Sequence, residues 1–290
     1  MYEKAPESIQ VSFPVVNGVI ADYEHMQTLI WEVLEKYAKT HIKGAEFIVA
    51  VPTDITEVEK KAFFDLFYKS GFRPKSVLLC EKPIAAAVGL ELDVNSPTGY
   101  MIVDIGADTT EISVISLGGL VLSELLHFGG RRLDESIMSY IKRNFNLVIG
   151  EKTACYLKEE LGYAFPEGPD KNAVIVGRDV VSGLPIEMEI SSAVVYEAIK
   201  ENLNGILSSI KMILEKTPPE LARDIIKSGI YLTGGASKIA CLDQLFTQVT
   251  NIRVNTCDYP EESVVRGLNR IVSEEKYRRL AFSMKTIIFR

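Results

Sequence analysis

The chain has 290 residues, of which 47% are hydrophobic, and it carries a formal net charge of −7 at pH 7. A soluble chain of this length buries a substantial core, as one large domain or as two of moderate size. The acidic balance argues against a nucleic-acid partner, because neutralising phosphates needs a basic face.

The cysteines and histidines give no sign of a disulfide framework or a zinc site. The four cysteines, like the three histidines, are widely spaced and form no CxxC or Cys/His ligand pattern. No signal-like segment opens the chain, and no apolar run approaches the roughly 18 residues of a membrane span. The sequence therefore predicts a protein of the reducing cytoplasm.

The first hundred residues alternate between predicted helices and strands. Apolar residues follow helical spacing from Asp22 to Thr40. The strand EFIVAVP ends at Pro52, and a capped helix then runs to Gly71. The strand SVLLC comes next, followed by a helix that starts near Pro83. Such alternation predicts an α/β sheet.

The rest of the chain presents two glycine turns, each at the end of a strand. MIVDIGADTTEISVISLGG, residues 101–119, reads as strand, polar turn and strand, and SGIYLTGGASKIACLDQLF reads as strand, glycine turn and helix. Between them the pattern predicts a helix over Arg131–Phe145 and a hairpin turning at Ser182-Gly183. Such turns hold nucleotide phosphates, because backbone N–H groups need close approach. We therefore expect a cleft with one turn on each side.

Asp108 is an unexpected residue in the first of these turns. A carboxylate about 4 Å from a phosphate charge, at an effective dielectric constant near 20, is repelled by roughly 4 kcal/mol. Its side chain also fills space where glycine would give access to the backbone. Asp108 thus predicts weakened phosphate binding, unless it caps the turn and points to solvent.

Five segments together resemble the bacterial actin-like MreB family, also called MreB/Mbl, of cell-shape proteins. They are NGVIADYE, PIAAAVG, PTGYMIVDIGADTTEISVISLGG, GGRRLDESI and KTPPELARDIIKSGIYLTGGASKI, and the resemblance extends from APESI to about Val272. It implies an α/β actin-like ATPase fold, as in actin, Hsp70 and sugar kinases, with two domains around a nucleotide cleft. Residues 1–95 with 258–290 would form the first domain, and residues 96–257 the second. ATP with Mg²⁺ is the implied cofactor.

The resemblance also implies site residues, position by position. Asp104 takes a catalytic position and is the candidate carboxylate for Mg²⁺; no other metal ligand is assigned. The implied nucleotide-binding residues are Gly106, Ala107, Asp108, Thr109, Thr110, Lys158, Gly234, Gly235 and Ala236. Ala107 and Asp108 replace two glycines of the family pattern. The glycines that remain serve nucleotide binding or only the positive φ of the turns.

Three further positions depart from the family pattern. Lys82 replaces the Glu credited with activating the attacking water, and losing a positioned base costs on the order of 10² to 10⁴ in rate. The adjacent Glu81 points in a different direction. Cys155 replaces the carboxylate that holds the ribose hydroxyls, as an apolar filler or a redox switch. Arg131 stands where the family has Asp after the glycines of GGRRLDESI.

The two ends of the chain bear on assembly and on membranes. Met1 aligns with the interior of the family fold, so the hairpin with the first phosphate turn either lies upstream or has been lost, leaving an exposed apolar edge. The polar KTHIKGAEF replaces an apolar membrane loop. The tail EEKYRRLAFSMKTIIFR mixes cationic and apolar residues. As a helix it would lie on an anionic membrane or pack on its own domain.

Three functions remain open at this point. The resemblance favours a cytoskeletal protein that forms filaments or copolymerises, determines rod shape and guides cell-wall synthesis, with ATP binding and hydrolysis weakened or lost. An active ATPase or sugar-kinase-like phosphotransferase is the second, since fold alone does not fix activity. The third is a nucleotide-free adaptor on MreB filaments. Lys82, Asp108 and Cys155 argue against the second.

Overall fold

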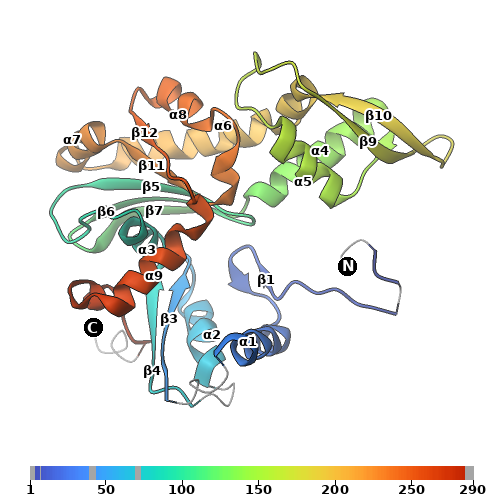
Figure 1. Cartoon of the computed structure of the whole chain (residues 1–290). Helices are drawn as coiled ribbons and strands as arrows, with labels where there is room; N and C mark the ends of the chain where they lie inside the picture. Colours follow the sequence, from blue (N-terminus) through green and yellow to red (C-terminus); the bar gives the residue numbers. More distant parts are fainter. Residues whose placement is uncertain (1–3, 7, 39–43, 69–72, 285–290) are drawn as a thin grey trace. The chain divides into compact units, whose positions relative to one another are not determined.

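The computed structural model describes residues 4–6, 8–38, 44–68 and 73–284. The chain divides into two compact units (Figure 1). Unit 1 comprises Met1–Thr98, Ser113–Leu125 and Glu262–Arg290, and unit 2 comprises Gly99–Ile112 and Leu126–Glu261. Unit 1 thus includes residues 113–125, which the sequence analysis assigns to the second domain.

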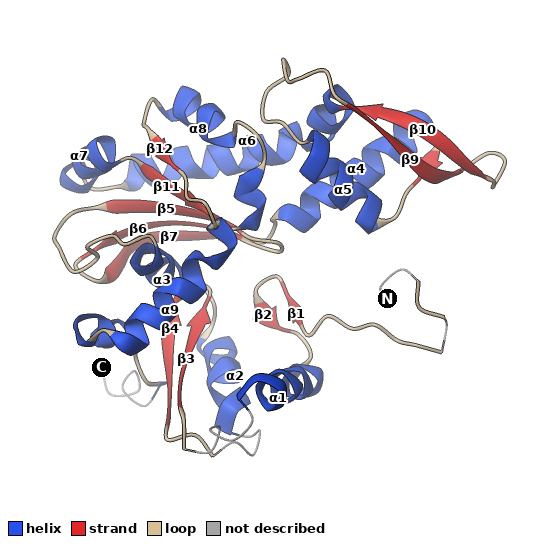
Figure 2. Ribbon diagram, in the orientation of Figure 1, coloured by secondary structure: helices blue, strands red, loops and turns tan. Residues whose placement is uncertain are grey.

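Unit 1 contains a parallel strand pair with helices packed around it (Figure 2). Its elements are β1 (Val15–Val16), β2 (Val19–Ile20), α1 (Tyr23–Ala38), β3 (Glu46–Val51), α2 (Glu57–Tyr68), β4 (Ser76–Glu81), α3 (Lys82–Gly89), most of β6 (Thr110–Ser116) and β7 (Gly119–Leu126), α9 (Ser263–Ser273) and the 3₁₀ helix η3 (Glu275–Leu280). β3 and β4 pair from Glu46↔Ser76 to Val51↔Glu81. The predicted helices and strands of this region are present, while Gly71 lies outside the described residues.

The helix starts of unit 1 follow from their residues. The Thr56 backbone N–H donates to Glu59 Oε2 at 2.7 Å, and the Glu59 N–H donates to Thr56 Oγ1 at 3.2 Å. This reciprocal pair is a capping box at the start of α2. Pro83 occupies the first turn of α3, where a missing N–H costs no hydrogen bond.

Helices α3 and α9 pack with their backbones almost in contact. A Cβ added to Gly89 would lie 1.9 Å from the Ser263 carbonyl oxygen, and one added to Gly267 would lie 1.7 Å from the Ala85 carbonyl oxygen. Neither glycine has a positive φ. Both are therefore required by the close approach of the two helices.

The tail packs on unit 1 up to Met284. Phe282 forms an antiparallel bridge with Leu79 of β4, with N–H to O distances of 2.8 Å in both directions. Leu280 is buried, and Phe282 and Met284 pack against the core around Val51 and Leu79. The predicted continuous tail helix is thus wrong for the described part, because η3 ends at Leu280 and Phe282 adopts a strand bridge. Residues 285–290 lie outside the described residues.

Unit 2 contains a parallel strand group and a separate antiparallel sheet (Figure 2). Its elements are β5 (Tyr100–Ile105), α4 (Gly130–Phe145), β8 (Leu147–Val148), α5 (Glu151–Leu161), β9 (Asn172–Asp179), β10 (Pro185–Ser191), α6 (Ser192–Lys216), α7 (Pro219–Ser228), β11 (Ile230–Thr233), η1 (Gly235–Lys238), α8 (Leu242–Thr250), β12 (Val254–Asn255) and η2 (Pro260–Glu262). β11 runs parallel to both β5 and β12 in a sheet of order β12-β11-β5-β6-β7, and the separate sheet has the order β10-β9-β8.

Two details of unit 2 bear on the sequence predictions. The hairpin of β9 and β10 turns at Ser182-Gly183, as predicted, with Gly183 at φ 73°. After the second glycine turn, however, the chain forms the short 3₁₀ helix η1, and α8 begins only at Leu242. The predicted order of strand, glycine turn and helix is thus present, with η1 between the turn and α8.

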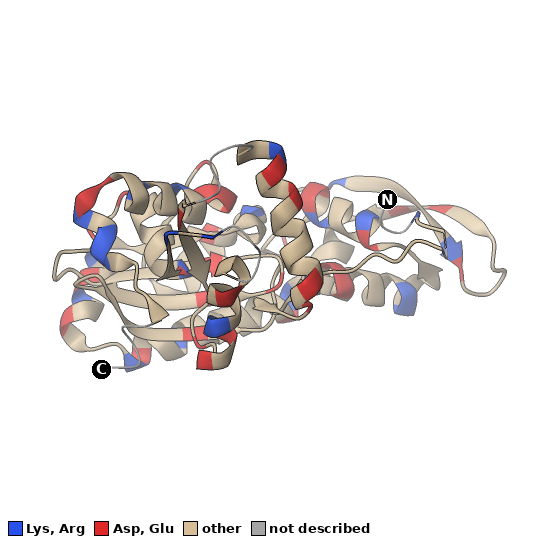
Figure 3. Cartoon of the chain, turned by 90° about the horizontal axis from the view of Figure 1, so that it is seen from below, with Lys and Arg blue, Asp and Glu red and all other residues tan. Residues whose placement is uncertain are grey.

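Charge is mixed over both units. Figure 3 shows Lys and Arg interspersed with Asp and Glu along the ribbon, in keeping with the net charge of −7. Such a distribution lacks the one-sided basic face of nucleic-acid binders. None of the described helices combines the length and the apolar character that a membrane span requires.

Candidate functional site

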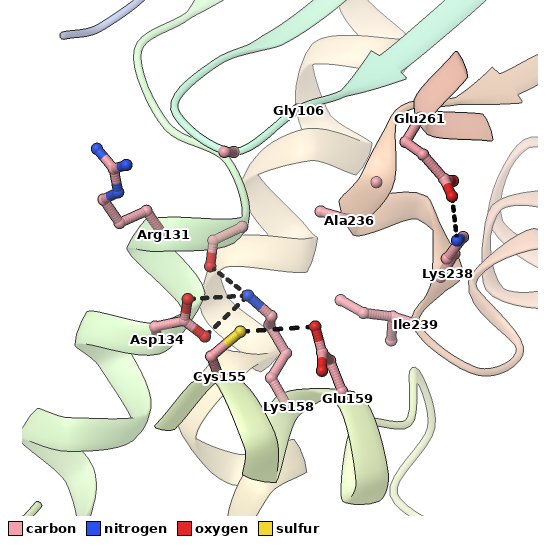
Figure 4. A pocket seen from close by; sticks show the side chains of 13 residues that line it. Gly106, Arg131, Asp134, Cys155, Lys158, Glu159, Ala236, Lys238, Ile239 and Glu261 are labelled. Carbon is pink, nitrogen blue, oxygen red and sulfur yellow. Dashed lines mark hydrogen bonds and ion pairs between the residues drawn. The ribbon is translucent and has the colours of Figure 1, made fainter. Parts of the chain in front are cut away.

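A cavity of about 620 Å³ lies entirely within unit 2 (Figure 4). Three groups of segments line it: the turn after β5 with the start of α4, one face of α5, and η1 with the end of η2. The lining residues are Gly106, Ala107, Gly130, Arg131, Asp134, Cys155, Lys158, Glu159, Gly235, Ala236, Lys238, Ile239 and Glu261. The volume is in the usual range for small-molecule sites, roughly 300 to 1,000 Å³.

The first wall is built by backbone hydrogen bonds between the turn and α4. The Gly106 N–H donates to the Thr109 carbonyl at 2.9 Å and closes the turn. The Gly130 N–H donates to the Gly106 carbonyl at 2.9 Å, and the Arg131 N–H to the Ala107 carbonyl at 2.8 Å. These bonds fix the start of α4 against the turn, so both segments face the cavity as one wall.

Glycine is required where the two turns meet their neighbours. A Cβ on Gly129 would lie 2.5 Å from the Gly106 carbonyl oxygen. Gly234 has φ 88°, and a Cβ there would lie 2.3 Å from Asp104 Oδ1. Asp104 itself is buried, with 3% of its surface exposed. Gly129 and Gly234 therefore shape the site through close packing.

Lys158 joins α5 to the start of α4. Its ammonium lies 2.8 Å from Asp134 Oδ1 and 2.9 Å from Oδ2, and it donates to the Gly130 carbonyl at 2.9 Å (Figure 4). Both side chains are nearly buried, at 11% and 12% exposure. Burial raises the pKa of the Asp134 carboxyl, an effect that Lys158 partly offsets. Lys158 thus holds the wall together through contacts with the protein itself.

Asp108 is paired with a cation. Arg131 Nη1 lies 2.8 Å from Asp108 Oδ1, and the two side chains are 40% and 19% exposed. In Figure 4 the Arg131 side chain points away from the Lys158 cluster. The sequence shows that both residues depart from the family pattern, but it does not show that they pair. Asp108 therefore does not act as the lone charge assumed in the sequence-based estimate of repulsion.

The remaining polar lining comes from α5, η1 and η2. Cys155 Sγ donates to Glu159 Oε1 at 3.6 Å, and burial is the main cause that raises the pKa of the Cys155 thiol. Lys238 Nζ lies 2.7 Å from Glu261 Oε1, and this pair is about half exposed. Glu159, Lys238, Ile239 and Glu261 were missed by sequence reasoning. No local pattern signals the Lys238–Glu261 pair, because it depends on where η1 and η2 meet.

The predicted site residues fall into two groups. Gly106, Ala107, Lys158, Gly235 and Ala236 line the cavity. The other predicted residues do not line it but lie close in sequence to residues that do; they are Asp104, Asp108, Thr109, Thr110 and Gly234.

The hydroxyl of Thr110 is bonded within the protein, and its predicted role in nucleotide binding stays a prediction. It is fully buried, and its hydroxyl donates to the Phe128 carbonyl at 2.9 Å.

Lys82 begins α3 in unit 1 and is half-buried. Burial raises the pKa of the neighbouring Glu81 carboxyl, although Lys60 acts in the opposite direction. In the part of the chain that the structure describes, no three His, Cys, Asp or Glu side chains gather closely enough to hold a metal ion.

Comparison with known proteins decides the family. The family model described as MreB/Mbl protein matches residues 1–279. The chain belongs to the MreB/Mbl family. Among curated MreB/Mbl relatives, the cell shape-determining protein Mbl of Bacillus subtilis is 38% identical over 271 residues, covering 92% of this chain and 80% of the relative. The cell shape-determining protein MreB of Escherichia coli K12 is 37% identical over 269 residues, covering 92% of this chain and 77% of the relative.

Solved structures confirm the predicted actin-like fold of this MreB/Mbl chain. The crystal structure of MreB5 of Spiroplasma citri bound to AMPPNP matches with a TM-score of 0.89 at 31% identity, covering 95% of this chain and 82% of that one. A structure of the same protein bound to ADP has the same TM-score. The MamK double helical filament matches in fold with a TM-score of 0.77 at 22% identity.

The cavity suits a nucleotide on geometric grounds as well. A Cβ added to Gly235 would meet only the Glu261 Cβ, at 4.0 Å, so the backbone of the second glycine turn is open. On the opposite wall, the turn after β5 presents Gly106 and Ala107. An accessible glycine backbone facing a cavity, as at Gly235, is what a phosphate-bearing ligand needs.

Proposed function

We propose that this chain is a cytoskeletal subunit of the MreB type, which self-associates or joins filaments of complete MreB-family subunits. In this role it contributes to rod shape and to the guidance of cell-wall synthesis. The observation that carries the assembly is an apolar row on α1, formed by Leu29, Val33 and Tyr37 at 49%, 46% and 75% exposure. Residues four apart lie on one helix face, and an exposed apolar face of this kind marks an interaction surface.

Sedimentation at micromolar concentration tests the assembly, with the chain alone and mixed with a full-length relative. We expect the chain to pellet under at least one of these conditions, and Val33→Lys to reduce pelleting. Val58→Lys is the matched control, because Val58 is 79% exposed on α2, outside the row. A monodisperse monomer that ignores the relative would contradict the proposal and favour an unrelated binding role.

For the cavity of unit 2, we propose an adenine nucleotide as the ligand. The support is the open backbone at Gly235 in the second glycine turn, the cavity volume and the AMPPNP and ADP bound to the Spiroplasma relative. Mg²⁺ would arrive with the nucleotide, because it is usually held by one or two carboxylates together with phosphates. Asp104 is the carboxylate proposed for it.

We further propose that hydrolysis is weak or absent. Lys82 carries a cation at the position where the family resemblance expects a carboxylate, and a cation cannot accept a proton from water. Steady-state ATP turnover should not exceed that of an Asp104→Ala control. Turnover clearly above the control would instead favour an active ATPase.

A cytoplasmic location is part of the proposal, and membrane contact through the tail stays a prediction. Leu280, Phe282 and Met284 are committed to packing within unit 1, which leaves Ile287, Ile288 and Phe289 as the apolar residues beyond the described part. Co-flotation with anionic vesicles, before and after removal of residues 285–290, tests this contact. Equal flotation of both forms would exclude the end of the tail as the anchor.

A further inference from the structure

Asp108 and Arg131 are held opposite each other by the backbone. Arg131 is the second residue of α4, and its N–H donates to the Ala107 carbonyl at 2.8 Å, next to Asp108 in the chain. The neighbouring Gly130 N–H bonds the Gly106 carbonyl at 2.9 Å. This arrangement brings Arg131 Nη1 to 2.8 Å from Asp108 Oδ1. Arg131 lines the cavity, and Asp108 lies beside the lining, next to Ala107.

The other ion pairs of the lining differ from this one in place and burial. Lys158 and Asp134 are almost buried, and Lys158 also bonds the Gly130 carbonyl, so its position is fixed. Lys238 and Glu261 stand on the opposite wall, at η1 and η2. Asp108 lies in the turn after β5 and Arg131 at the start of α4, with side chains 19% and 40% exposed. A partly exposed ion pair contributes only modestly to the stability of the fold.

The charge of Asp108 opposes a polyphosphate at this turn unless it is compensated. Like charges at close range repel strongly where water is partly excluded. A guanidinium stays protonated at every physiological pH and pairs well with carboxylate and phosphate. With Arg131 at 2.8 Å, the turn presents a neutral pair in place of a free carboxylate.

We propose that Arg131 is a specificity-determining residue that compensates Asp108 and thereby admits nucleoside di- and triphosphates to the cavity. This inference rests on the proposed function, in which the cavity binds an adenine nucleotide. The effect of Arg131 on ligand affinity should therefore grow with the number of phosphates. The affinity for adenosine should stay unchanged.

A double-mutant cycle on the full chain tests the inference. Equilibrium binding of adenosine, ADP and AMPPNP is measured for the wild type, Arg131→Gln, Asp108→Asn and the double variant. We expect Arg131→Gln to weaken AMPPNP binding about tenfold, ADP binding less, and adenosine binding less than about twofold. Arg131→Lys, which keeps the charge, should restore most of the loss.

Compensation predicts that the two charges cancel. The double variant, which has neither charge, should bind AMPPNP within about twofold of the wild type, because the turn is neutral in both proteins. Asp108→Asn alone should strengthen AMPPNP binding, and it stays informative if Arg131→Gln fails to fold. The matched control is Arg132→Gln, which removes the adjacent cation of α4, paired with Glu135 and 59% exposed. It should change AMPPNP binding less than about twofold.

The outcomes separate this inference from the proposed function. Equal AMPPNP binding by the wild type and Arg131→Gln would overturn the inference and leave nucleotide binding intact. AMPPNP binding by the double variant as weak as by Arg131→Gln would overturn compensation, because removing the Asp108 charge would then restore nothing. Failure of every variant to bind any of the three ligands would overturn the proposed nucleotide site, and the inference with it.

Discussion

The two units hold their helices together by opposite means. In unit 1, α3 and α9 meet where glycines leave no side chain between the backbones, with Gly89 facing Ser263 and Gly267 facing Ala85. In unit 2, α4 and α5 are joined by the nearly buried Lys158–Asp134 pair. An added Cβ would collide with backbone in the α3–α9 contact. In the α4–α5 contact, loss of the Lys158 charge would leave a nearly buried carboxylate without its cation. The α3–α9 contact of unit 1 is thus limited by sterics, whereas the α4–α5 contact of unit 2 includes a nearly buried ion pair.

The steric contact should be the more sensitive of the two. Gly267→Ala places a Cβ 1.7 Å from a backbone carbonyl oxygen, which cannot move without shifting α3. We expect a loss of about 3 kcal/mol or more in the unfolding free energy of unit 1. Trp31, the single tryptophan, lies in α1 of unit 1, so its fluorescence during denaturation follows this unit.

Gly119→Ala is the control for that substitution. Gly119 lies in β7, and the nearest atom to an added Cβ is 4.0 Å away. Its denaturation midpoint should stay close to that of the wild type. Equal destabilisation by the two substitutions would contradict the steric account of the α3–α9 contact.

Removing the charge of Lys158 should destabilise unit 2 by about 3 kcal/mol. Lys158→Met leaves the Asp134 carboxylate nearly buried without its cation, and breaking such a pair typically costs 3–5 kcal/mol. Circular dichroism during denaturation, compared with Trp31 fluorescence, locates the loss in unit 2. Lys152→Met is the control, on the exposed side of the same helix.

A rescue experiment sharpens the electrostatic argument. Asp134→Asn combined with Lys158→Met removes both charges, so the double variant should be more stable than Lys158→Met alone. If the double variant is less stable than the single one, the pair acts through packing and not through charge.

The tail contact should have a smaller effect on unit 1. Phe282→Ala removes a partly buried ring from the core around Val51 and Leu79 but leaves the backbone bridge to Leu79 in place. We expect a loss of about 2 kcal/mol, less than for a fully buried ring. Tyr37→Ala, at 75% exposure in the same unit, should change stability by less than about 0.5 kcal/mol. Similar losses for both would argue against tail packing.

Thiol labelling should distinguish the two units without changing their stability. Burial raises the pKa of Cys80 in unit 1 to about 12, so almost no thiolate forms at about pH 8 and Cys80 should stay unlabelled in the native state. Cys155 also has a raised pKa but lines the cavity, so it should react slowly and faster as the pH rises. AMPPNP should slow the labelling of Cys155. Unchanged labelling at saturating AMPPNP would place the nucleotide elsewhere.

Local patterns in the sequence predicted much of the fold. The capped start of the helix after Pro52, the helix start at Pro83 and the hairpin at Ser182-Gly183 depend on neighbouring residues, and all three are present. The family resemblance supplied the actin-like architecture, which the structural neighbours confirm. Features that depend on contacts between segments distant in the sequence could not be predicted from local patterns.

The tail and the ion pair of the first turn show where prediction failed. Phe282 bridges Leu79 across most of the chain length, and nothing local indicates this partner. Asp108 and Arg131 were each recognised as departures from the family pattern, but their pairing follows from the backbone bonds between the turn and α4. The sequence-based argument considers Asp108 alone, because the sequence does not show its ion pair with Arg131; weakened phosphate binding stays a prediction.

Amide hydrogen exchange of the whole chain, with and without saturating AMPPNP, tests most directly whether unit 2 has kept its nucleotide site. The account predicts slower exchange in the three backbone segments around the cavity, residues 106–109, 130–134 and 234–238, all within unit 2. The Arg131→Gln variant should show less protection at the same concentration of AMPPNP. Unchanged exchange in all three segments, under conditions where AMPPNP binding is detected, would contradict the assignment of this cavity.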